Sequence, residues 1–116
     1  MKRCGNLGGD EYTVLGNALA ILAGLELDKE YVYEKIVNGE LFDCSLSMKI
    51  FKYDALLTAN KAKWQGQVRD EIRKGYKKML DTGSSTVWET IEGASAFDNA
   101  GSLCHGWSAI PIVYLK

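Results

Sequence analysis

The chain has 116 residues, of which 47% are hydrophobic and 25% are charged, a balance that indicates a folded globular protein and excludes an intrinsically disordered one. Its formal net charge of −1 gives no electrostatic attraction for nucleic acid or for an anionic membrane, so we expect neither as a partner. No apolar run approaches the length of a membrane span. The length corresponds to one domain or to part of one.

The cysteines and the N-terminal residues indicate the cellular compartment and whether a metal or cofactor is expected. Cys4, Cys44 and Cys104 are odd in number and widely spaced, and no apolar signal segment follows the first residues. Both features favour reduced thiols in a compartment such as the cytoplasm. A zinc site made from these cysteines and His105 lacks a Cys-x-x-Cys pair. The glycine-rich segment 5–9 does not follow a strand, as a phosphate loop requires. We therefore expect no metal and no cofactor.

Five helices are predicted in chain order, and no stretch shows the period-two alternation of a strand. Asp28 is a predicted N-cap and Gly39 the residue just beyond the end of the second helix. Thr82 and Gly83 end the fourth helix. The predicted helices span residues 12–25, 28–38, 46–59, 62–80 and 104–115.

These five helices differ in how much of their surface is apolar. Helices 28–38 and 62–80 have one apolar face, the latter formed by Trp64, Val68, Ile72 and Tyr76. Helices 12–25 and 104–115 are apolar nearly all round, so each predicts burial on every side. Helix 46–59 is intermediate, with Lys49, Lys52 and Asp54 on its polar side.

This alternation of buried and half-exposed helices predicts an all-α fold with two concentric helical layers. Its architecture would be a partial (α/α)6 barrel, a six-hairpin toroid built from α-hairpins. Two and a half hairpins cannot close a ring, so apolar surfaces remain open. We expect them to be covered by the remainder of the barrel or by self-association.

Candidate functional residues gather in the segments Gly83–Gly93 and Ser102–Trp107. They are the carboxylate of Glu89, the imidazole of His105 and the indoles of Trp88 and Trp107. Carbohydrate hydrolysis uses all three residue types. From the residues alone, Glu89 also fits an exposed loop acid, His105 a structural histidine, and each tryptophan a core aromatic.

Four segments, in one consistent order, resemble the six-hairpin glycosidases, and more narrowly the catalytic domain of glycoside hydrolase family 78, the α-L-rhamnosidases. The most specific are the Thr-Val-Trp-Glu run within 85–90 and the Ser-Leu-Cys-His run within 101–109. The other two are 13–25 and 46–57. The resemblance covers nearly the whole chain and implies that residues 1–116 are the C-terminal portion of such a domain.

The resemblance implies roles for two of the candidates: Glu89 would be the general base that activates water, and His105 would hold the sugar. Trp88 and Trp107 are candidate stacking faces for a sugar ring by residue type alone. The general acid would lie in an earlier barrel segment, which leaves Glu92 and Asp98 as solvated loop acids. Two features depart from the family pattern: Cys104 stands where asparagine is common, and the loop 90–102 is shorter. Either departure would be expected to change which sugar the site prefers.

An inverting glycosidase needs two carboxyl groups about 6.5–9.5 Å apart, one as acid and one as base. Hydrogen-bond donors keep the base ionised, and Thr86, Thr90 and the backbone of Ser84 and Ser85 are the predicted donors. The predicted function is the general-base side of an inverting α-L-rhamnosidase-like enzyme, inert as an isolated chain, with a carbohydrate substrate. The alternatives are a non-enzymatic helical module that binds a sugar or a partner, and a truncated remnant.

Overall fold

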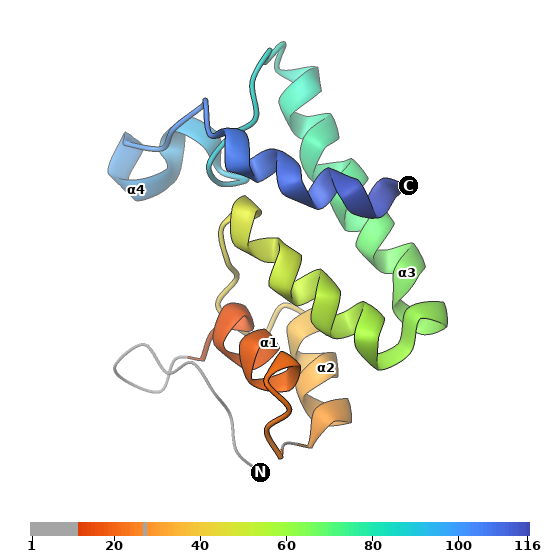
Figure 1. Ribbon diagram of the computed structural model, residues 1–116. Helices are drawn as coiled ribbons and strands as arrows, with labels where there is room; N and C mark the ends of the chain where they lie inside the picture. The colour runs from red at the N-terminus through yellow and green to blue at the C-terminus, as the bar shows by residue number, and fades with distance from the viewer. Residues whose placement is uncertain (1–11, 27) are drawn as a thin grey trace. The chain divides into compact units, whose positions relative to one another are not determined.

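The structure is a computed structural model that describes residues 12–26 and 28–116 (Figure 1). Cys4, the glycine-rich segment 5–9 and Leu27 lie outside these residues. The described chain is mostly helical and contains no strand, which confirms the predicted all-α class. None of its helices combines the length and the apolar character needed to cross a membrane.

The chain divides into two compact units. Unit 1 comprises the described residues up to Cys44 together with Phe51–Lys61. Unit 2 comprises Ser45–Ile50 and Ala62–Lys116, and it contains all four candidate site residues.

Unit 1 contains two capped helices, α1 (Val14–Leu22) and α2 (Lys29–Val37). The Thr13 hydroxyl accepts a hydrogen bond from the Gly16 N–H at 3.0 Å, and the Asp28 carboxylate accepts one from the Tyr31 N–H at 3.3 Å. Gly39 follows α2 with a φ of +80°, a conformation that glycine adopts without strain. The predicted boundaries at Asp28 and Gly39 are therefore confirmed.

Helix α3 (Lys49–Asp81) follows the short 3₁₀ helix η1 (Leu46–Met48) and joins two helical stretches. Asn60 has extended backbone angles inside it, a φ of −159° and a ψ of 92°. This interruption lies between the predicted helices 46–59 and 62–80, so the two separate helices are confirmed. In the second stretch Trp64, Val68 and Ile72 are buried, as the one-faced pattern predicts.

The predicted polar side of the first stretch is wrong in part, because Lys49 and Lys52 are buried. The Lys49 ammonium lies 2.8 Å from a carboxylate oxygen of Glu71, which neutralises its charge within unit 2. Glu71 lies in the second stretch of α3, so the local pattern of residues 46–59 contains no sign of this partner.

Unit 2 continues with a loop and then η3 (Gly106–Leu115). A helix is found where 104–115 predicts one, but it is a 3₁₀ helix rather than an α-helix. Pro111 lies inside it and has no N–H to donate to an α-helical ladder, and its ring would clash with the carbonyl four residues earlier. Two short elements were not predicted, η2 (Gly93–Ser95) and α4 (Ala96–Asn99).

The two helices expected to be buried all round are buried on one side only. In α1, Val14, Ala18 and Ile21 are buried, whereas Leu19 and Leu22 are exposed. In η3, Ser108 and Pro111 are buried, whereas Trp107, Ile110, Ile112 and Val113 are exposed. Each of the two helices therefore has exposed apolar side chains on one side.

Candidate functional site

The two segments that carry the candidate residues are joined by backbone hydrogen bonds in unit 2. The Glu89 N–H donates to the Ser102 carbonyl at 2.9 Å, and the His105 N–H donates to the Val87 carbonyl at 2.8 Å. The Thr86 hydroxyl also donates to the Leu103 carbonyl. Residues 86–89 and 102–105 are thus held side by side, although η2 and α4 lie between them in the sequence.

The Glu89 carboxylate accepts a hydrogen bond from the backbone N–H of Ser102 at 3.3 Å and is half-buried. The donors predicted for it are different. Thr86 donates to Leu103 instead, and the buried Thr90 hydroxyl has no hydrogen-bond partner among the described residues. The sequence alone did not indicate Ser102, because its N–H reaches Glu89 only after the loop has folded back.

Two glycines close this loop. A Cβ added to Gly101 would overlap the Gly93 carbonyl oxygen, and one added to Gly93 would lie 2.9 Å from the Trp88 ring. Gly93 also has a φ of +65°. Glycine often lets a backbone approach a ligand closely. In the structure they let the loop close on itself and on Trp88.

The two indoles of the candidate set have opposite environments. Trp88 is 7% exposed and packs with Leu46 and Met79, and its Nε1 donates to the Ser84 hydroxyl at 3.1 Å. A ring buried in this way has no open face for a sugar. Trp107, on η3, is 70% exposed and does have one.

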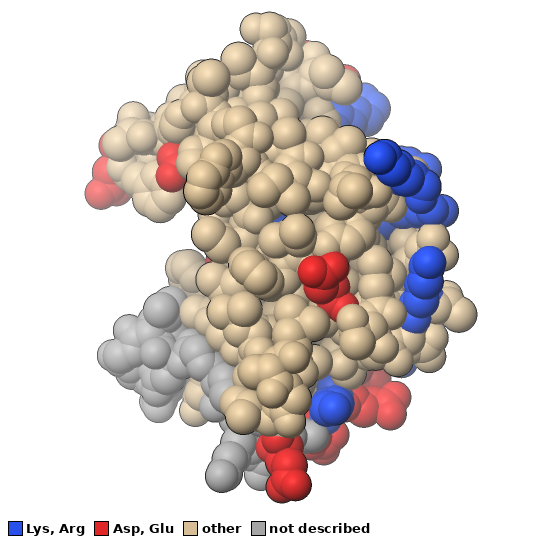
Figure 2. Space-filling view, viewed as in Figure 1, with Lys and Arg blue, Asp and Glu red and all other residues tan. Residues whose placement is uncertain are grey.

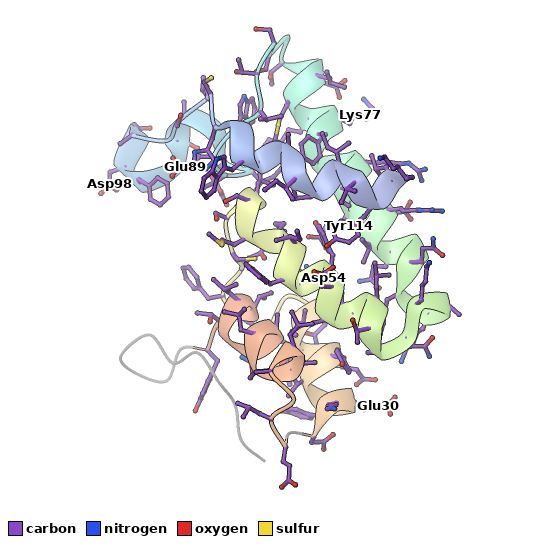
Figure 3. The ribbon with its side chains drawn as sticks, viewed as in Figure 1. Glu30, Asp54, Lys77, Glu89, Asp98 and Tyr114 are labelled. Carbon is purple, nitrogen blue, oxygen red and sulfur yellow. The ribbon has the colours of Figure 1, made fainter. Side chains whose placement is uncertain are left out.

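The remaining polar groups lie around the start of η3. His105 is half-buried and immediately precedes η3, while Glu92 and Asp98 are exposed, as expected of solvated loop acids. Figure 3 shows Glu89 beside the beginning of η3 and Asp98 further out on α4. Glu89 and His105 are thus brought to one region, with Trp107 in the first turn of η3.

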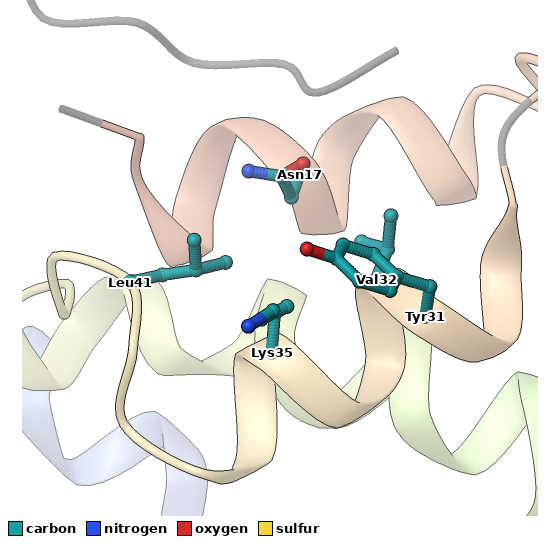
Figure 4. Close-up of a pocket in the computed structure, with 5 residues that line it drawn as sticks. All are labelled: Asn17, Tyr31, Val32, Lys35 and Leu41. Carbon is teal, nitrogen blue, oxygen red and sulfur yellow. The ribbon is translucent and has the colours of Figure 1, made fainter. Parts of the chain in front are cut away.

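A small pocket lies in unit 1, between α1 and α2, and Figure 4 shows the residues around its opening. It encloses about 180 Å³ including its open mouth, which is less than most ligand sites occupy. The Asn17 amide donates to the Thr13 carbonyl at 2.7 Å, and Lys35 pairs with Glu40. The lining residues are Asn17, Tyr31, Val32, Lys35 and Leu41.

Among the described residues, no group of three His, Cys, Asp or Glu side chains is placed to hold a metal ion. Neither Cys44 nor Cys104 forms a disulfide bond within the described residues. No family model, curated protein or solved structure matches this chain. The resemblance to the six-hairpin glycosidases rests on the motifs themselves.

Proposed function

We propose that this chain supplies the general-base side of an inverting glycosidase active site that resembles the α-L-rhamnosidases. The observation that carries the proposal is the pairing of 86–89 with 102–105, which joins the two segments that bear the family-like motifs. The resemblance concerns only the residues of the two motifs and does not depend on any hydrogen bond between them. Their contact is therefore an independent point in its favour.

Each residue has a defined task in the proposed site. Glu89 removes a proton from the attacking water while the water oxygen bonds to the anomeric carbon. The hydrogen bond from the Ser102 N–H holds the Glu89 carboxylate in position. His105 hydrogen-bonds the sugar, and Trp107 offers its exposed ring as a stacking face. Trp88 supports Gly93 and the loop from within the core.

The proposed architecture is part of an (α/α)6 barrel, with the general acid in a segment outside this chain. The open apolar sides of α1 and η3 support this, because an inner helix of such a barrel is covered on both sides. Without the acid, a leaving group that needs protonation stays attached. We therefore expect no turnover of 4-nitrophenyl α-L-rhamnoside by the chain alone.

A substrate that needs no acid tests the base directly. In α-L-rhamnosyl fluoride the C–F bond breaks and fluoride leaves unprotonated, while water attacks and its proton passes to Glu89. We expect slow release of fluoride that Glu89→Gln reduces by about 10²-fold or more. Glu92→Gln is the matched control, since Glu92 is an exposed acid of the same loop, and it should leave the rate unchanged.

The same assay separates the proposal from a sugar-binding module. Saturable binding of L-rhamnose, without fluoride release that depends on Glu89, would favour a module that binds sugar and does no chemistry. If the chain neither binds L-rhamnose nor releases fluoride, the proposed carbohydrate function is wrong altogether.

A further inference from the structure

The 3₁₀ geometry of η3 sorts its side chains into straight rows. A 3₁₀ helix has three residues per turn, so side chains three positions apart lie directly above one another. Ser108 and Pro111 form the row that faces the core of unit 2. Trp107, Ile110 and Val113 form another row, and they are 70%, 43% and 49% exposed. We name these three side chains the η3 row.

Hydrogen bonds between side chains and backbone carbonyls hold η3 in place. The Tyr76 hydroxyl donates to the Ser108 carbonyl, and Arg69 donates through Nη2 to the Lys116 carbonyl at 2.6 Å. The Tyr114 hydroxyl donates to the Ile50 carbonyl at 3.3 Å. The η3 row is thus presented by an element fixed at both ends, which limits the entropy lost when a partner binds.

Charge is distributed unevenly along η3. Before its N-terminal end lie the exposed acids Glu92 and Asp98, and at its C-terminal end lie Arg69 and Lys116. Figure 2 shows acidic atoms over the α4 region and basic atoms toward the other end of η3. No charged residue belongs to the row itself.

We propose that the η3 row is a self-association surface, on which a second copy of this chain docks antiparallel about a two-fold axis. A straight, uncharged row is complementary to itself in this orientation, with Ile110 at the axis and Trp107 opposite the partner's Val113. The acidic end of each copy then meets the basic end of the other. A parallel arrangement would oppose like charges, and this selects the antiparallel pair.

Sedimentation equilibrium on the whole chain tests the pairing. We expect a mass that rises with concentration from 12.8 kDa to twice that value and no further. Added salt should weaken the pair, because it screens the charges at the two ends. Trp107→Lys and Ile110→Lys should each give a monomer. Leu80→Lys is the matched control, since Leu80 is an exposed apolar residue of unit 2 outside the row, and it should still pair.

Acrylamide quenching gives a second measurement on the same samples. Trp64 and Trp88 are buried, so the quenchable emission of the monomer comes from Trp107. Pairing should therefore protect the emission as concentration rises. A monomer at every concentration would overturn the proposal, as would growth beyond two copies or pairing that survives both lysine variants.

One consequence rests on the proposed function, because the sugar site and the η3 row share Trp107. Saturating L-rhamnose should then dissociate the pair. If pairing occurs and L-rhamnose leaves it unchanged, the shared use of Trp107 is wrong while the pairing stands. If no pairing occurs but fluoride release depends on Glu89, the pairing fails while the proposed function stands.

Discussion

Gly101 occupies a position where any side chain would collide with the loop closure. A Cβ there would overlap the Gly93 carbonyl oxygen, and the backbone must shift to admit it. We expect Gly101→Ala to lower the free energy of unfolding by about 1–3 kcal/mol, as overpacking does. Gly106→Ala is the control, since nothing lies within 4 Å of its added Cβ. Equal urea midpoints for the two variants would contradict the observed closure.

Ser108 presents the opposite case, a polar side chain that is fully buried. Its Oγ has no hydrogen-bond partner among the residues that the structure describes, and the residue is fully buried. Removing an unsatisfied hydroxyl should be neutral or stabilising, so we expect Ser108→Ala to raise the unfolding free energy by up to about 1 kcal/mol. A clear loss of stability in urea titrations would show that the hydroxyl is bonded in solution.

At the scale of elements, the N-terminal caps of α1 and α2 make separate contributions. The side chains of Thr13 and Asp28 each accept one backbone N–H bond that would otherwise be unsatisfied. We expect Thr13→Ala and Asp28→Ala each to cost about 1 kcal/mol. Thr58→Ala, at an exposed interior position of α3, should cost much less. Thermal unfolding gives the melting temperatures of the three variants, and equal values would show that the two caps do not stabilise the fold.

The attachment of η3 to α3 should depend on pH through Tyr76. Burial raises the pKa of Tyr76 from 10.0 to about 12, and nearby Lys49 opposes this shift. Because the folded state favours the neutral phenol, its contribution is complete below about pH 10 and is lost as the pH rises toward 12. Denaturant unfolding at about pH 9 and 11 should show this loss in the wild type and less of it in Tyr76→Phe. If the unfolding free energy of the wild type and of Tyr76→Phe depends on pH in the same way, the burial of the Tyr76 hydroxyl is contradicted.

The helices show which structural features the sequence alone predicts correctly. The one-faced pattern of 62–80 predicts burial of Trp64, Val68 and Ile72, because a helical period is a local property. The 3₁₀ geometry of η3 was not predicted, since an apolar run does not distinguish three residues per turn from 3.6. Pro111 was the available signal, because a proline within an α-helix removes a hydrogen bond.

The site follows the same division. Residue type and motif spacing make Glu89, His105 and both tryptophans candidates, but the environments of these side chains depend on contacts distant in sequence. Trp88 is buried because Leu46 and Met79 reach it from other elements. Glu89 bonds to Ser102 because the loop closes between Gly93 and Gly101. These contacts join residues that are distant in the sequence, so a local sequence pattern does not predict them.

At the scale of the whole molecule, α1 and η3 each expose apolar side chains, as surfaces that bind another protein segment often do. In the proposed barrel, the rest of the toroid covers them. In the proposed pair, a second copy covers the η3 row. The mass of the native gene product, by immunoblot of the producing cells, distinguishes these states. A band several times larger than this chain would favour the barrel, and a band at the mass of the chain itself would favour the pair.

The most direct test of the proposed site is an L-rhamnose titration followed by amide ¹H–¹⁵N chemical shifts. We predict saturable shifts at Val87–Glu89 and Ser102–Trp107, with the pocket residues Asn17 and Tyr31 unmoved. The shifts should weaken in Glu89→Gln and His105→Ala and persist in Glu92→Gln. The absence of shifts at the paired segments, or shifts confined to other residues, would contradict a sugar site at Glu89 and His105.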